Sequence, residues 1–192
     1  MNVQNLAAAA DAFTANAWLV DGAVLVDVGS DPVVLDELDG THLEAVIITH
    51  SHHDHIENLP QIVDRFSPDV HAFEPGNLPV DAEPLQDGET VTLAGYTFDV
   101  LHTPGHRDDH ICLYSDMENV LFAGDLVFPG GEFGRTDLDQ GDRDRLIRSI
   151  ERIVDLDVDE LYTGHGPAAT DRVSEQLADS LAAAREREPK YS

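Results

Sequence analysis

Seven residues, THSHHDH at positions 49–55, place four histidines and one aspartate side by side. They could be solvated polar residues of a loop, or ligands arranged around metal. They follow the apolar run EAVIIT, which predicts a buried strand, and loops at strand ends are held by a rigid scaffold. His50 and His52 are two residues apart, so an extended turn points both the same way, whereas Asp54 and His55 can point elsewhere. One short loop could therefore supply ligands to two metal ions.

Three further residues of ligand type follow apolar runs elsewhere: His106 after VLHTPG, Asp125 after VLFAG and His165 after ELYTG. Each of these apolar runs ends in a glycine, which lets the backbone turn sharply. If these strands lie side by side, their ends converge on one edge of a sheet. Imidazole and carboxylate groups meeting there suit divalent ions such as zinc or iron. This convergence favours the metal interpretation, and the two oxygens of Asp125 could bridge two ions.

The elements that must position these residues are apolar runs separated by turn residues. The runs predict nine strands, at residues 16–20, 23–29, 44–49, 69–73, 90–95, 97–103, 111–115, 119–124 and 160–164. Helices are predicted at residues 58–66, 142–154 and 171–188. Strands in two batches, with helices between and after them, indicate two sheets covered by helices. Residues 127–141 are expected to form a long glycine-bearing loop, a kind of segment that often carries function.

The length of 192 residues favours a single domain spanning residues 1–192. No apolar run approaches the roughly 18 residues that a membrane span requires, and the N-terminus lacks the basic region of a secretory signal. The single cysteine, Cys112, excludes an internal disulfide and fits a reducing cytosol, so a cytoplasmic location is expected. Within HICLYS, Cys112 is expected to be a buried core residue rather than a nucleophile.

The chain is strongly acidic, with 38 acidic against 11 basic residues and a formal net charge of −27. An acidic surface repels phosphate groups, so we expect neither nucleic acid nor anionic membranes as partners. We interpret the composition as halophilic adaptation, because charge repulsion is screened within about 3 Å at 1 M ionic strength. An ordinary acidic protein is the alternative interpretation.

The motifs together resemble the metallo-β-lactamase superfamily. THSHHDH matches its T-H-x-H-x-D-H signature, and VLVDVG, TPGHRDDH, FAGD and TGHG resemble its other motifs in the same order, over about residues 16–166. The resemblance implies a four-layer αββα sandwich of two mixed β-sheets flanked by helices.

The resemblance also implies two divalent metal ions, Zn²⁺ first, with iron or manganese as alternatives. The first ion would be bound by three histidines: His50, His52 and His106. The second would be bound by one aspartate and two histidines: Asp54, His55 and His165. Asp125 would bridge the ions, and Asp54 and Asp125 are the expected catalytic residues.

Three residues are expected around the ligands or at the substrate. Asp27 resembles a residue that orients the cluster. His110 matches the second histidine of a GH-x-x-GHI pattern of thioester-hydrolysing members, with a structural role as the alternative. Arg135, in GRTD, either forms a structural ion pair with Asp137 or shapes substrate entry.

The implied activity is metal-dependent hydrolysis. Two ions lower the pKa of a shared water towards about 7, and the resulting hydroxide can attack a carbonyl carbon. The segment GDLVFPGGEFGRTDL resembles the glyoxalase II-like, or hydroxyacylglutathione hydrolase-like, branch, which implies a small thioester substrate. The alternatives are a persulfide dioxygenase with a single iron, a lactonase or other ester hydrolase, and a protein that only binds metal.

Two departures from the branch bear on the substrate. Arg107 and Asp109 stand where the family usually has threonine and glycine. We also expect the chain to lack the C-terminal helical domain with which long glyoxalase II enzymes grip glutathione, so another small thiol carrier stays open. A homodimer is a weaker expectation from the resemblance.

Overall fold

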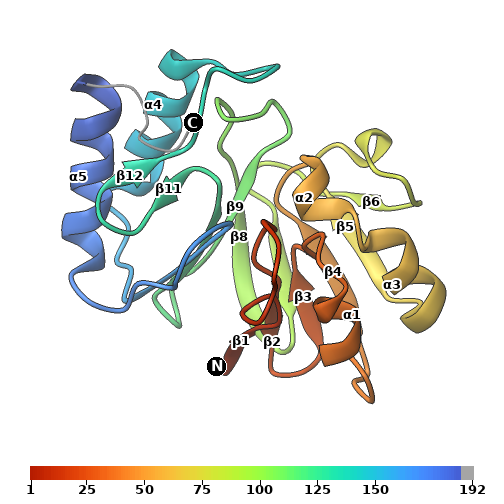
Figure 1. The fold of residues 1–192 in the computed structure, drawn as a ribbon. Helices are drawn as coiled ribbons and strands as arrows, with labels where there is room; N and C mark the ends of the chain where they lie inside the picture. The colour runs from red at the N-terminus through yellow and green to blue at the C-terminus, as the bar shows by residue number, and fades with distance from the viewer. Residues whose placement is uncertain (187–192) are drawn as a thin grey trace. The chain divides into compact units, whose positions relative to one another are not determined.

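The computed structural model describes residues 1–186, which pack as two compact units (Figure 1). The first unit contains residues 1–86 together with residues 92–96, and the second contains residues 87–91 together with residues 97–186. Each unit has its own sheet and its own buried apolar cluster. The expectation of one domain over residues 1–192 stays a prediction.

The first unit is built on a six-stranded mixed sheet in the order β1-β2-β3-β4-β5-β6. Its strands are β1 (Val3–Asn5), β2 (Trp18–Val20), β3 (Val24–Val26), β4 (Ala45–Ile48), β5 (Asp69–Ala72) and β6 (Glu83–Pro84). The pairs β1–β2 and β2–β3 are antiparallel, whereas β3 to β6 run parallel. β1 and β6 were not expected from the sequence, because their short polar segments VQN and EP lack the apolar pattern of a strand.

The helices of the first unit lie in the connections between its strands. They are α1 (Val33–Glu37), α2 (His53–Ile56), α3 (Leu59–Phe66) and the 3₁₀ turn η1 (Pro75–Asn77). The helix predicted at 58–66 is confirmed, beginning one residue later, and it buries Leu59 and Ile62 in the unit's core. The short helix α2 lies inside the histidine stretch, so only the part up to His52 is extended.

The second unit is built on a five-stranded mixed sheet in the order β13-β10-β9-β8-β7. Its strands are β7 (Thr90–Leu93), β8 (Tyr96–His102), β9 (Ile111–Ser115), β10 (Val120–Gly124) and β13 (Glu160–Thr163). β8, β9 and β10 are antiparallel neighbours, and β13 runs parallel to β10. Residues 92–96, at the tip of the β7–β8 hairpin, belong to the first unit.

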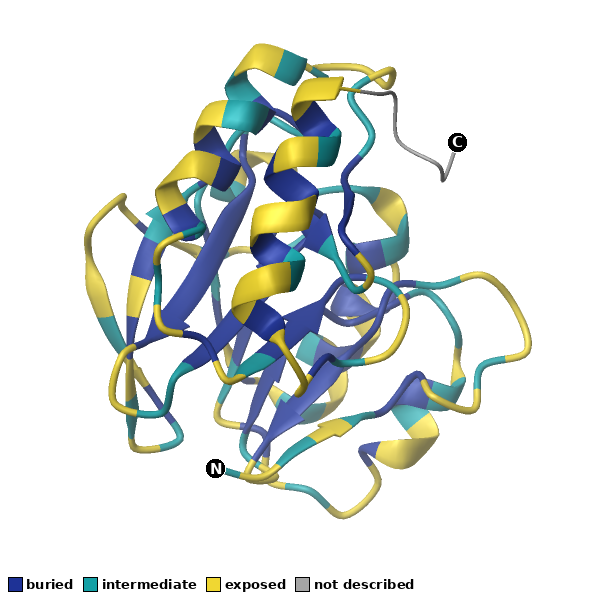
Figure 2. Ribbon diagram, turned by 90° about the vertical axis from the view of Figure 1, so that its left-hand side faces the viewer, coloured by how far each residue is buried: buried dark blue, intermediate teal, exposed yellow. Residues whose placement is uncertain are grey.

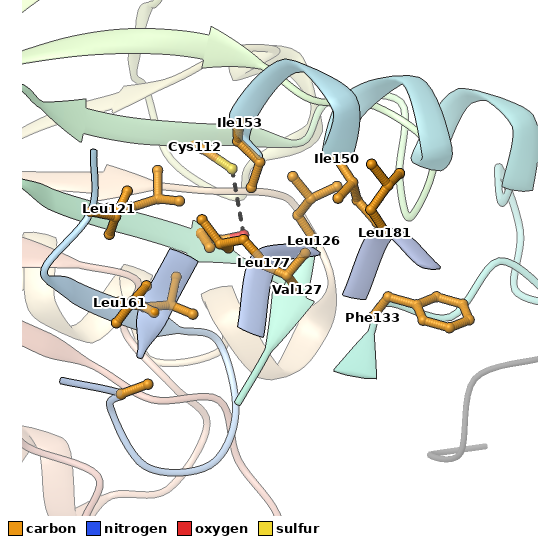
Figure 3. Close-up of a cluster of buried hydrophobic side chains, with 14 of the residues drawn as sticks. Cys112, Leu121, Leu126, Val127, Phe133, Ile150, Ile153, Leu161, Leu177 and Leu181 are labelled. Carbon is orange, nitrogen blue, oxygen red and sulfur yellow. Dashed lines mark hydrogen bonds between the residues drawn. The ribbon is translucent and has the colours of Figure 1, made fainter. Parts of the chain in front are cut away.

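Two amphipathic helices, α4 (Arg143–Ile153) and α5 (Val173–Glu186), complete the second unit. Figure 2 shows exposed residues alternating with buried ones along the helices that face the viewer. The buried side of α4 carries Leu146, Ile150 and Ile153, as its predicted apolar stripe requires. Figure 3 shows Ile150 and Ile153 among the apolar side chains of the strands and of α5. Each such burial removes a side chain from water and contributes about 1.5–3 kcal/mol.

The remaining helix predictions are confirmed with small shifts of their ends. Asp142 is the N-cap of α4 and accepts a hydrogen bond from the Arg145 backbone at 2.9 Å. α5 begins at Val173 rather than at residue 171, and the last two predicted residues, 187 and 188, lie outside the described part of the chain. Over residues 1–186, no helix has both the length and the hydrophobicity needed to cross a membrane.

The loop predicted at residues 127–141 is wrong for its first part, whereas residues 134–141 contain no helix or strand. Its first part forms a small antiparallel ribbon of β11 (Val127–Phe128) and β12 (Glu132–Phe133). Two residues per strand are too few to produce a periodic pattern, and the glycines at the turn dominate the sequence signal. Val127 and Phe133 are buried, so the ribbon is anchored in the second unit's core.

Candidate functional site

The predicted ligands of the first unit lie at one edge of its sheet. β3 and β4 are parallel, with Val26 paired to Ile47, so the residues that follow these strands emerge together. Asp27 follows β3, and Thr49 and His50 follow β4. The convergence of strand ends expected from the sequence is therefore present in this unit.

Asp27 is a buried carboxylate that holds this edge together. It accepts hydrogen bonds from the backbone nitrogen and the hydroxyl of Thr49, both at 2.8 Å, and from Nδ1 of His55 at 2.9 Å. Its backbone φ is +57°, a left-handed conformation that costs a non-glycine residue about 1–3 kcal/mol. Three hydrogen bonds to one carboxylate offset that strain. The expected role of Asp27 in orienting metal ligands stays a prediction.

The hydrogen bonds define the proton positions on two histidines. A carboxylate only accepts, so Nδ1 of His55 donates to Asp27 and Nε2 is the ring nitrogen without a proton. The Thr49 hydroxyl donates to Asp27 and therefore accepts from Nδ1 of His50 at 3.1 Å, which again leaves Nε2 as the lone-pair nitrogen. Nε2 of His50 lies 3.0 Å from Nδ1 of His52. The rings of His55 and His50 are thus oriented by Asp27 and Thr49, and each has Nε2 as the nitrogen that could bind a metal ion.

The rest of the histidine stretch lies on α2. Asp54 is half-buried, and one of its oxygens lies within 4.8 Å of a ring nitrogen of His55. His53, at the variable position of the motif, is exposed, and its Nδ1 lies 3.3 Å from Glu57 one helical turn later. α2 therefore separates Asp54 and His55 from the outward-facing His53.

The predicted ligands of the second unit also lie at one sheet edge. The end of β8, the start of β9, and the ends of β10 and β13 meet there, because β8–β9–β10 are antiparallel and β10–β13 is parallel. His106 follows β8, His110 precedes β9, Asp125 follows β10 and His165 follows β13.

Asp125 lies between two histidines of this edge. Its Oδ2 is 3.4 Å from Nε2 of His106 and 3.5 Å from Nε2 of His165. Ligand atoms on a tetrahedral ion with bonds of about 2.0–2.1 Å lie roughly 3.3 Å apart. The separations therefore suit nitrogen and oxygen donors that share an ion, and Asp125 is positioned as a residue common to both histidines.

His106 is oriented by a backbone group of the loop after β12. Its Nδ1 donates to the carbonyl oxygen of Arg135 at 2.8 Å, which leaves Nε2 as the lone-pair nitrogen that faces Asp125. The Arg135 guanidinium itself forms a two-bonded ion pair with Asp137, at 2.9 and 2.8 Å. This hydrogen-bonded contact lowers the pKa of the Asp137 carboxyl. Of the two roles considered for Arg135, the structural ion pair is the one that its contacts support.

His110 supports the backbone of Asp125. Its Nε2 accepts from the Asp125 backbone nitrogen at 3.0 Å, so its Nδ1 carries the proton and donates to the Thr103 hydroxyl at 2.8 Å. Cys112 lies next to Thr103, and burial raises the pKa of its thiol to about 12. The thiol stays protonated at neutral pH, as the expected core role of Cys112 requires.

Sequence reasoning assigned no role to Thr49, to Thr103 or to the carbonyl of Arg135. The hydroxyls could have been suspected because each directly follows a strand, Thr49 next to His50 and Thr103 three residues before His106. The carbonyl could not, because every residue has one and only the path of the loop selects it. In both units the donors are imidazole nitrogens and carboxylate oxygens, with oriented rings, and this chemistry fits a divalent ion such as zinc.

Comparison with known proteins identifies the family. A sequence model described as the Metallo-beta-lactamase superfamily matches residues 10–165, most of the chain. The chain belongs to the metallo-β-lactamase superfamily. The predicted family is confirmed, and membership in this superfamily implies a site for two metal ions.

Curated relatives agree with the predicted branch of the superfamily. The hydroxyacylglutathione hydrolase of Chromohalobacter salexigens is 36% identical over 157 residues, covering 77% of this chain and 60% of the relative. Hydroxyacylglutathione hydrolase GloC of Haemophilus influenzae is 33% identical over 180 residues, covering 77% of this chain and 82% of the relative. The chain thus spans about 60% of the length of the first relative, and of a similar one from Aliivibrio fischeri.

Solved structures confirm the fold class. The BLEG-1 B3 metallo-beta-lactamase aligns with a TM-score of 0.78 and 29% identity, covering 93% of this chain and 97% of that chain. TTHA1623 in a di-iron-bound form aligns with a TM-score of 0.72 and 27% identity, covering 98% and 99%. The α/β class with two mixed sheets and helices is therefore that of the metallo-β-lactamase fold.

Proposed function

We propose that this metallo-β-lactamase superfamily member is a metal-dependent hydrolase of the glyoxalase II type that cleaves a small thioester. The observation that carries the proposal is the position of the Asp125 carboxylate, 3.4 Å and 3.5 Å from the lone-pair nitrogens of His106 and His165. The curated relatives named hydroxyacylglutathione hydrolase support the reaction type.

The proposed ligands are those that the family motifs imply. One ion would be held by three histidines: His50, His52 and His106. The other would be held by Asp54, His55 and His165. Asp125 would bind both ions, and zinc is the first candidate, with iron and manganese as alternatives. The orientation of each ring by Asp27, by Thr49 or by the Arg135 carbonyl supports this set, because such contacts fix which nitrogen carries the lone pair that a metal ion needs.

When bound, the two ions would supply a hydroxide near neutral pH and polarise the carbonyl of the substrate. The chain's own residues hold that chemistry in place. Asp54 and Asp125 provide the carboxylate oxygens, and the His110 ring fixes the backbone of Asp125 through a 3.0 Å hydrogen bond. The buried, protonated Cys112 is not available as a nucleophile, which agrees with direct attack by water rather than a covalent thioester intermediate.

The substrate is proposed only as a class. Arg107 and Asp109, which depart from the branch pattern, form an ion pair with each other at 3.3 Å. The pairing reduces the charge that either side chain presents to a substrate. A neutral acyl group near this loop is therefore compatible with Arg107 and Asp109. The thiol carrier stays open between glutathione and another small thiol.

The test is an assay on S-lactoyl thioesters of glutathione, coenzyme A and a small thiol, with released thiol and oxygen consumption measured together on metal-analysed protein. We expect thiol release without oxygen uptake, with about two metal ions per chain. Asp125→Ala should abolish turnover, whereas Asp116→Ala, in an exposed turn, should retain it.

Other outcomes would replace the proposal. Iron at one ion per chain with oxygen uptake on a persulfide would indicate a persulfide dioxygenase. Turnover of lactones or simple esters alone would indicate a different esterase, and full metal content with no turnover on the panel would indicate a binding protein. Unchanged activity in Asp125→Ala would refute the role of that carboxylate.

A further inference from the structure

Arginines are scarce in this chain, yet three of them gather at one pocket of the second unit. The sequence has ten arginines and one lysine against 38 acidic residues. Arg145, Arg148 and Arg152 lie three and four residues apart on α4, so they share one face of the helix. They line a pocket of about 280 Å³. The complete lining consists of His102, Pro104, Arg145, Arg148, Ser149 and Arg152.

Several contacts hold the walls of this arginine pocket in place. The buried Ser149 hydroxyl donates to the Pro104 carbonyl at 2.6 Å, which ties α4 to the loop after β8. The His102 ring donates from Nε2 to the Asp108 carbonyl at 2.7 Å. Arg152 donates from Nη1 to the His102 carbonyl at 3.0 Å. Ser149, His102 and Arg152 are therefore held in fixed orientations, while Arg148 is exposed at the open side of the pocket.

The charges around the pocket do not cancel. Arg145 pairs with Asp108, and Arg152 lies 2.6 Å from Asp87. Backbone and side-chain hydrogen bonds lower the pKa of the Asp87 carboxyl even though desolvation opposes them, so it is ionised at neutral pH. Within residues 1–186, the Arg148 side chain has no hydrogen bond or ion pair. Three guanidinium groups thus face two carboxylates, which leaves a local positive charge on a chain of net charge −27.

The guanidinium groups also have N–H donors that their ion pairs do not use. Each carries five N–H donors in a planar fork that suits phosphate and carboxylate oxygens. The side-chain contacts of Arg145 and Arg152 involve one nitrogen each, Nη1. A small oxyanion could therefore bind Arg148 together with the remaining N–H groups of its neighbours without breaking either ion pair.

We propose that the arginine pocket binds a small molecule through an oxyanion group of the phosphate or carboxylate type. Its volume is close to the lower end of small-molecule pockets, about 300 Å³. An acidic surface elsewhere would repel such a ligand, so binding should be confined to this positive face. The occupant would touch Pro104, two residues before His106, and so would contact the loop that carries a proposed metal ligand.

The experiment is calorimetric titration of the metal-loaded protein with inorganic phosphate and with succinate at constant ionic strength. We expect saturable binding of one oxyanion per chain, weakened at least 10-fold in Arg148→Gln. Arg172→Gln removes an exposed arginine outside the pocket and is the matched control, with unchanged binding expected. Metal content is measured in every variant, because oxyanions also bind metal ions.

The outcomes decide the proposal. Loss of binding in Arg148→Gln with unaltered metal content supports it. Absence of saturable binding in the wild type, or equal binding in wild type and Arg148→Gln, overturns it. Binding of an acidic glutamate-rich peptide but of neither small oxyanion also overturns it, and would assign the pocket to a protein partner instead.

Discussion

At the scale of single residues, one carboxylate orders much of the first unit's edge. Asp27 accepts two hydrogen bonds from Thr49 and one from His55, and through the Thr49 hydroxyl it also sets the proton position on His50. A carboxylate can accept all three hydrogen bonds through its two oxygens. An asparagine amide has one oxygen and one NH₂ group, so it would direct N–H groups at one of the donors. The ability of His50 and His55 to bind metal through Nε2 therefore depends on Asp27.

We expect Asp27→Asn to weaken metal binding by about 10- to 100-fold, the usual effect of removing a residue that orients a metal-binding histidine. Competition with a chromophoric chelator measures the affinity. Asp21→Asn is the matched control, since Asp21 lies in the same unit, also has a positive φ and accepts hydrogen bonds from Asn2 and Tyr96. Wild-type metal affinity in Asp27→Asn would contradict the orienting role.

At the scale of elements, the segment after β12 positions His106 by passing very close to β10. A Cβ on Gly134 would lie 1.9 Å from the backbone oxygen of Asp125, a distance that no side chain can adopt. The absence of a side chain lets the next residue, Arg135, bring its carbonyl to His106. A glycine that looked like an ordinary loop residue is therefore required by a close backbone approach.

Gly134→Ala should lower the free energy of unfolding by about 3 kcal/mol, because the backbone must move to relieve the clash. It should also reduce metal affinity by displacing the Arg135 carbonyl. Gly130→Ala is the control: its φ is +82°, but the added Cβ meets nothing within 4 Å, so about 1 kcal/mol is expected from backbone strain alone. Denaturant titration gives both values, and equal losses in the two variants would exclude the close-approach explanation.

At the scale of the whole molecule, the dominant feature is the net charge of −27. Repulsion among exposed acids acts over about 10 Å at 0.1 M ionic strength and over about 3 Å at 1 M. The composition alone predicts a protein adapted to high salt, and this stays a prediction, as does the expected homodimer.

We expect the melting temperature to rise between 0.1 and 2 M potassium chloride, in the concentration range where screening still increases. Each kcal/mol gained should raise the melting temperature by about 2–4 °C for a chain of this length. Thermal unfolding followed by circular dichroism at several salt concentrations measures the effect. Full stability in dilute buffer, with no gain on adding salt, would favour the ordinary acidic protein.

The sequence by itself determined the apolar runs of the central strands, the three longer helices and the histidines and aspartates that follow strand ends. These features are local, since strand and helix periods and glycine turns are visible within a few residues. The family motifs then added the expected ligand set.

Only the tertiary structure decided which groups orient those ligands and where charge collects. The Arg135 carbonyl that meets His106, the Thr49 hydroxyl between Asp27 and His50, and the arginine pocket on α4 all depend on contacts between distant segments. The short strands β1 and β6 likewise exist because a neighbouring strand offers hydrogen-bonding partners. Such contacts are selected by packing and leave no periodic trace in the sequence.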